Sequence, residues 1–174
     1  MDRVATFVGV LGLAAAAGAL MIGELVVLPG LTGPSVLLGP NLATTIAGPI
    51  HLRCAEVALV GTIVLALALP HWLSARFATA AALLAIGFAA FNRLVVLPTV
   101  YEAWGKVDLV AARPLARLTE AEALAEQATW MSAGLAVCLL TVAGFVAAHR
   151  PRKPAARPSP APEPAAPETA PAAS

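Results

Sequence analysis

The chain has 174 residues, of which 59% are apolar and 12% are charged, and its mean hydropathy is +0.82. Soluble domains carry about a quarter charged residues, so this composition excludes an ordinary soluble domain and indicates an integral membrane protein. The net charge is +1, with four basic residues gathered between 150 and 157, and nucleic acid is not an expected partner. Cys54 and Cys138 lie in apolar runs without metal-ligand spacing and are interpreted as packing residues, and we expect neither a metal nor a cofactor.

A helix that spans the bilayer needs about 20 predominantly apolar residues. The apolar stretches that meet this requirement are residues 4–28, 50–69, 77–97 and 128–148. The second stretch carries His51, Arg53 and Glu56 in its first two turns and is apolar from Val57 onward. The sequence therefore predicts an all-α integral membrane protein, a bundle of four transmembrane helices within residues 1–148.

The connections between these stretches also carry signals. Residues 29–49 hold four prolines and no charge, so we expect them at the membrane interface or as a shallow re-entrant segment. Pro70 is expected to end the second helix and Ser74 to cap the third, which makes these two spans antiparallel neighbours. Thr119 and Glu122 have capping-box spacing, which predicts a helix that begins near Thr119, projects beyond the bilayer and continues into the fourth span.

The residues after 148 have a different composition. Residues 149–174 contain eight prolines and no large apolar side chain, which predicts a disordered tail. With four spans the two termini share a side, and the positive-inside rule selects that side by its lysines and arginines. The side of the termini carries Arg3, Arg76, Arg150, Arg152, Lys153 and Arg157, and the opposite side carries Lys106, Arg113 and Arg117. We expect cytoplasmic termini and a bacterial inner membrane location.

Two segments of the chain repeat one motif. "GELVVLPG" at 23–30 is echoed by "NRLVVLPT" at 92–99, with Glu24 in one copy where the other has Arg93. Each charge lies five residues before a proline, or about 7 Å along a helix axis. A lone charge in the bilayer centre costs at least about 3 kcal/mol on insertion scales, so such groups normally pair. The echo predicts an ion pair between Glu24 and Arg93.

The remaining charges of the apolar stretches fall at a similar depth. We expect Glu24, Arg53, Glu56, Asn92 and Arg93 to converge in the outer half of the membrane, where two carboxylates neutralise two guanidinium groups. Arg53 and Glu56 are also spaced to meet on one helix face.

Two functions fit this charged cluster. In the first, it fixes helix register in a non-enzymatic bundle that associates with itself or with subunits of a membrane complex. In the second, it binds or conducts a proton or a small ion, with Glu24 or Glu56 as the carrier. Pro29, Pro49 and Pro98 are expected at helix ends near the cluster, where free backbone carbonyls would favour a cation or water site.

Other patterns give weaker signals. His71 and His149 are placed at one depth, as haem ligation across facing helices requires, although solvated interfacial histidines are far commoner. Small residues recur at four-residue spacing and favour close helix packing, within one chain or between chains. They are Gly12 and Ala16, then Ala81, Ala85 and Ala89. The sequence shows no hydrolase motif or phosphate loop, so we predict no catalytic residue.

Two quoted segments carry a family resemblance. "LATTIAGPIHLRCAEVAL" at 42–59 and "NRLVVLPTVYEAW" at 92–104 resemble a family of small four-span membrane proteins of unknown function, typified by the human cisplatin-resistance-associated transmembrane protein. Asn92, Arg93 and Pro98 fit the Asn-then-Pro pattern of that family. A histidine that family members tend to carry near the start of the last span is absent here, where Trp130 stands instead. The chain also resembles anthrone-oxygenase-like membrane proteins, which would imply an enzyme.

Overall fold

The structure is a computed structural model that describes residues 2–27, 40–71, 73, 75–108, 111 and 114–148. Its elements are the α-helices α1 (Asp2–Ile22), α3 (Pro40–Ala68), α4 (Arg76–Phe91), α5 (Leu97–Trp104) and α6 (Leu115–Ala148), the π-helices η1 (Gly23–Val27) and η3 (Asn92–Val96), and the 3-10 helix η2 (Leu69–His71). The predicted all-helical fold is confirmed for these residues.

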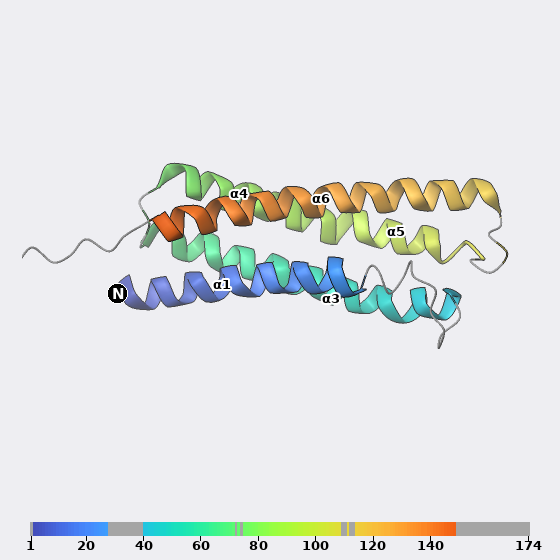
Figure 1. Cartoon of the computed structure of the whole chain (residues 1–174), viewed down its shortest axis with the longest axis horizontal. Helices are drawn as coiled ribbons and strands as arrows, with labels where there is room; N and C mark the ends of the chain where they lie inside the picture. The colour runs from blue at the N-terminus through green and yellow to red at the C-terminus, as the bar shows by residue number, and fades with distance from the viewer. Residues whose placement is uncertain are drawn as a thin grey trace, which may run out of the picture.

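The helices form an antiparallel bundle. Figure 1 shows that α1 and α3 run side by side in opposite directions, that α4 and α5 form one long rod beside α6, and that α6 ends near the start of α1. Four helices are long and apolar enough to cross a membrane, as predicted. They are Arg3–Leu25, Thr45–His71, Arg76–Trp104 and Leu115–Ala148. The predicted tail at 149–174 lies outside the described residues, as do Pro29, Ser74 and His149.

The second helix begins earlier than the sequence predicted. Residues 40–49, expected in the connection, form the first turns of α3, and Pro49 lies inside the helix rather than at its end. Pro40 suits the first helical position because its missing amide hydrogen would have no intrahelical partner there. Pro70 lies in η2, where α3 ends as predicted. Residues 29–39 lie outside the described part of the chain.

The third helix does not end before Pro98. It continues through η3 into α5 and ends at Trp104, so the predicted end at residue 97 is wrong. In η3 the Leu97 amide bonds to the Asn92 carbonyl, five residues back. Proline has no amide hydrogen and its ring collides with the carbonyl four residues earlier in an α-helix, and the wider π turn just before Pro98 accommodates both defects.

The last helix is a single rod of 34 residues from Leu115 to Ala148, as its predicted continuity required. Its start differs from the prediction, because the Pro114 carbonyl already accepts hydrogen bonds from the amides of Arg117 (3.1 Å) and Leu118 (3.2 Å). Thr119 donates its hydroxyl to the Ala116 carbonyl at 3.0 Å. The predicted capping box at Thr119 is therefore wrong.

Small residues bring the helices into close contact. A β-carbon on Gly61 of α3 would lie 2.8 Å from both the Ala16 amide nitrogen and the Gly12 carbonyl oxygen of α1. The predicted small-residue positions of α4 are buried as well. They are Ala81, Ala85 and Ala89. The small-residue pattern therefore joins helices within one chain.

Two apolar clusters fill the bundle at different levels. The larger is centred on residues such as Leu65, Leu69 and Val142, toward the end that holds the first turn of α1. The smaller gathers Val96, Leu97, Val100 and Ala128 from the π segment, α5 and α6. α3, α5 and α6 all extend past the end of α1 at this second end (Figure 1). A layer of polar side chains lies between the two clusters.

Candidate functional site

The polar layer gathers side chains from all four helical rods. Glu24 comes from η1, His51 from α3, Asn92 from η3 and Ser132 from α6. The last three are buried, with 5%, 5% and 4% of their surface exposed. Since buried polar groups are costly unless they are hydrogen-bonded, each of their contacts is informative.

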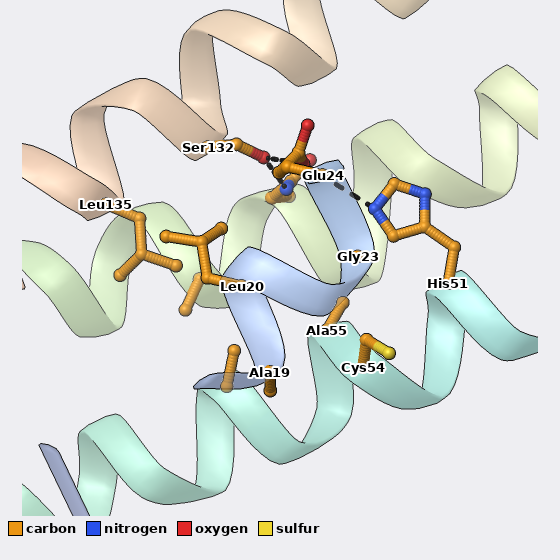
Figure 2. Close-up of a pocket in the computed structure, with 12 residues that line it drawn as sticks. Ala19, Leu20, Gly23, Glu24, His51, Cys54, Ala55, Ser132 and Leu135 are labelled. Carbon is orange, nitrogen blue, oxygen red and sulfur yellow. Dashed lines mark hydrogen bonds and ion pairs between the residues drawn. The ribbon is translucent and has the colours of Figure 1, made fainter. Parts of the chain in front are cut away.

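Glu24 lies between a hydroxyl group and an imidazole ring. The Ser132 hydroxyl donates a hydrogen bond to its Oε1 at 2.5 Å, and His51 Nε2 lies 3.6 Å from the same oxygen. Figure 2 shows the Glu24 carboxylate between Ser132 and His51, with Gly23 on the same turn. The Glu24 side chain is 20% exposed, so the carboxylate is largely withdrawn from solvent.

His51 is held from its other side by Tyr101. The Tyr101 hydroxyl lies 2.6 Å from His51 Nδ1, and the two rings meet edge to face at 83°. Where the hydroxyl donates to Nδ1, the ring hydrogen of neutral His51 lies on Nε2 and faces Glu24. Glycines make room for both rings, because a β-carbon would lie 3.0 Å from the His51 ring at Gly23 and 3.0 Å from the Tyr101 ring at Gly48.

Asn92 is only half satisfied. Its side-chain amide nitrogen donates to the Ser132 hydroxyl oxygen at 3.2 Å. Its Oδ1 is buried and has no hydrogen-bond partner among the residues that the structure describes. An unpaired buried acceptor costs about 1–3 kcal/mol, so this oxygen favours a ligand that supplies a donor or a positive charge.

The other charged residues of the predicted cluster, Arg53, Glu56 and Arg93, form a separate group. Arg53 Nη1 contacts Glu56 Oε2 at 2.5 Å, and Arg93 Nη2 contacts the other oxygen, Oε1, of the same carboxylate. The contact between Arg53 and Glu56 on one helix face is confirmed. The predicted pair of Glu24 with Arg93 is wrong, because Arg93 reaches across to Glu56 of α3 while Glu24 faces Ser132 and His51.

The predicted cluster is therefore divided in two. One carboxylate, Glu56, faces two guanidinium groups, whereas Glu24 has a histidine that is charged only when it is protonated. Sequence reasoning had left His51, Tyr101 and Ser132 out of the site. The signal that could have found them is a polar residue inside an apolar stretch. The spacing of residues along separate helices, however, does not tell which helix faces pack against each other.

A small cavity is lined by Glu24, His51, Asn92 and Ser132, and also by Leu20 and Cys54, which Figure 2 labels. The space open to the centre of a water molecule is about 20 Å³, enough for one water or one small ion. No group of three or more His, Cys, Asp or Glu side chains suited to a metal is found in the described parts of the chain.

Comparison with known proteins assigns no relative. No protein family, no curated protein and no solved structure matches this chain. Of the two histidines considered as haem ligands, His71 lies at the end of η2, and His149 lies outside the part of the chain that the structure describes.

Proposed function

We propose that this chain is an integral membrane protein that binds and releases a proton at Glu24, inside a bundle of four spanning helices. The observation that supports this proposal most directly is the division of charge. Both nearby guanidinium groups contact Glu56, so no fixed cation among the residues that the structure describes neutralises Glu24.

The physical argument starts from the cost of burying charge. An ionised carboxylate in an apolar environment is costly unless a proton, a cation or a hydrogen-bond network compensates it. Glu24 and His51 lower this cost by sharing one proton, carried either on the carboxyl or on the imidazole. Both arrangements leave the pair without net charge, and removal of the shared proton leaves a net negative charge. The pair is therefore suited to reversible protonation.

The helix lengths support a position near one membrane surface. Arg93 lies 17 residues beyond Arg76, or about 25 Å at the helical rise, and Glu24 lies 21 residues beyond Arg3, or about 32 Å. The hydrocarbon core of a bilayer is about 30 Å thick. If Arg3 and Arg76 mark the cytoplasmic boundary, the polar layer lies close to the opposite boundary, which shortens the path of a proton from water to Glu24.

A carbodiimide reagent tests the proposal. Dicyclohexylcarbodiimide reacts with a protonated carboxyl in apolar surroundings: the carboxyl adds across one C=N bond, and the adduct rearranges to a stable N-acylurea with no leaving group. We expect mass spectrometry of the protein in native membranes to find the adduct at Glu24. Glu56 is the matched control, because its contacts with Arg53 and Arg93 favour the ionised, unreactive form.

The variants sharpen this test. Glu24→Gln should abolish labelling, while Glu56→Gln should leave Glu24 labelled. Labelling confined to Glu56, or an absence of labelling at Glu24 over a broad pH range, would refute proton binding at this carboxyl.

A structural role, in which charged contacts fix the helix register, is a second candidate function for the group of Arg53, Glu56 and Arg93. Glu56 links α3 to η3 through Arg93, which supports this role without involving Glu24. The resemblance to the four-span family would carry a role onto Asn92, Arg93 and Pro98, of which Asn92 and Arg93 lie one in each group and Pro98 lies in α5. Self-association or a membrane partner would be tested by copurification from native membranes.

A further inference from the structure

One residue that lines the cavity beside Glu24, Asn92, carries an oxygen that proton binding leaves unused. Asn92 Oδ1 is buried and unpartnered among the described residues, and Asn92 lines the cavity together with Glu24 and Ser132. We infer that this cavity takes a small monovalent cation, of the size of Na⁺, in competition with the proton. The inference rests on the proposed function, since it assigns a second ligand to the same carboxylate.

The donor atoms favour a hard cation. Glu24 offers a carboxylate, Asn92 an amide carbonyl and Ser132 a hydroxyl oxygen, and they come from three different helical rods. Oxygen-only ligands are typical of hard cations rather than of transition metals. A water molecule would satisfy the Asn92 oxygen but would leave the Glu24 charge uncompensated, whereas a cation satisfies both.

Charge and size then narrow the choice of cation. The pocket has a single carboxylate, so a monovalent ion neutralises it, while a divalent ion would leave a positive charge among apolar side chains. The space open to the centre of a water molecule, about 20 Å³, favours an ion close to water in size or smaller.

Every titratable neighbour is compatible with this exchange. The ionisable groups near Glu24 are His51 and Cys54 on α3 and, behind His51, Tyr101 on α5. A neutral His51 turns one edge toward the carboxylate and adds no positive charge that would repel the cation. Binding is a balanced exchange, in which Na⁺ enters, the carboxyl releases one proton, and the net charge of the pocket does not change.

Protection against the carbodiimide measures this competition. The labelling rate at Glu24 is followed in native membranes at fixed pH and ionic strength, in sodium, potassium or choline chloride. We expect saturating Na⁺ to slow labelling by about tenfold or more, with K⁺ weaker and choline without effect. Adding sodium to weakly buffered purified protein should also release protons, and Glu24→Gln should abolish this release.

Matched variants separate the cation from the proton. Asn92→Leu should still be labelled without sodium, but should need about tenfold more Na⁺ for half-protection, comparable to the loss caused by disturbing a metal-binding shell. Ser132→Ala should also raise the Na⁺ concentration needed for half-protection. It replaces Asn92→Leu in this test if that variant does not fold. Thr62→Val is the control, because Thr62 is buried in α3, does not line the cavity and donates its hydroxyl to the Ala58 carbonyl.

The outcomes are distinct. Equal slowing by all three salts would reduce the effect to ionic strength and overturn the cation inference. Labelling of Glu24 with no sodium effect would also overturn it, while the proposed proton site would stand. Failure to label Glu24 at all would remove both proposals.

Discussion

Two glutamates of one bundle illustrate how local contacts decide the role of a residue. Glu56 has an arginine on each carboxylate oxygen, one from its own helix and one from the next rod. Glu24 instead has a hydroxyl and an imidazole. The first carboxylate is therefore held in its charged form by fixed cations, while the second has partners that can exchange a proton.

Neutralising these two glutamates should affect stability to different extents. Glu24→Gln keeps an oxygen that can accept the Ser132 hydrogen bond and removes a partly buried charge, so we expect stability to change by less than about 1 kcal/mol. Glu56→Gln leaves Arg53 and Arg93 without a carboxylate and should lower the thermal midpoint clearly. Thermal unfolding of both variants in the same detergent checks this order, and a larger loss for Glu24→Gln would contradict it.

Tyr101 should set the tautomer of His51. Tyr101→Phe removes the hydroxyl 2.6 Å from Nδ1 and leaves a buried ring nitrogen without a partner, which costs about 1–3 kcal/mol. Nitrogen chemical shifts of labelled histidine should report hydrogen on Nε2 in the parent protein and a mixed population in the variant. An unchanged His51 spectrum would mean that the Tyr101 hydroxyl does not position the ring.

The sequence predicted the depth of the charged residues better than their partners. Depth along each helix follows from residue number at about 1.5 Å per residue, so Glu24, Glu56 and Arg93 were correctly placed near one level. Pairing depends on helix rotation and on which helices are neighbours. α1 packs mainly against α3, and α4 against α6, yet Glu24 of η1 contacts Ser132 of α6 and Arg93 of η3 contacts Glu56 of α3.

The echoed motif has its meaning at the level of the element. Both copies form π-helices, Gly23–Val27 and Asn92–Val96, and each charge is the second residue of its π segment. A π turn inserts one extra residue and so rotates the side chains that follow, and such turns occur frequently at functional sites. The matched positions of Glu24 and Arg93 therefore reflect the same π-helical backbone conformation in both segments. They do not reflect an ion pair between the two residues.

The contact between α1 and α3 should tolerate no added carbon at Gly61. Gly61→Ala places a β-carbon 2.8 Å from backbone atoms of α1, which cannot move without separating the helices, so we expect a loss of about 1–3 kcal/mol. Gly87→Ala is the matched control, because a β-carbon there meets nothing within 4 Å and helix propensity should add about 0.5–1 kcal/mol. Unfolding in mixed detergent micelles measures both, and equal stability of the two variants would contradict the close contact.

At the scale of the whole molecule, the bundle is longer than a membrane is thick. The 34 residues of α6 extend about 51 Å, against about 30 Å of hydrocarbon. Apolar runs identified the four helices in the sequence, but they stopped short of the polar first turns of α6 and of the turns of α5 after Pro98. α5 and α6 pack on each other in the second apolar cluster, which contains Val100 and Tyr101 together with Leu124, and hydropathy along one segment does not contain this tertiary contact.

Cysteine labelling tests this arrangement together with its orientation. Ala123→Cys and Val137→Cys lie 14 residues apart, about four turns and 21 Å, on exposed positions of α6. Val137 is 63% exposed on the isolated bundle, and we expect lipid to cover it. Ala123 lies nine residues beyond Ser132, or about 13 Å outside the polar layer, and should be in water.

In a background with Cys54 and Cys138 replaced by serine and alanine, a membrane-impermeant maleimide added to intact cells should label Ala123→Cys at least about tenfold faster than Val137→Cys. The reason is that a thiol reacts through its thiolate, which lipid surroundings suppress. Labelling of Ala123→Cys only after the cells are opened would reverse the orientation derived from the basic residues. Rapid labelling of both positions in intact cells would show that α6 is not embedded, and with it the membrane setting of the Glu24 site would be lost.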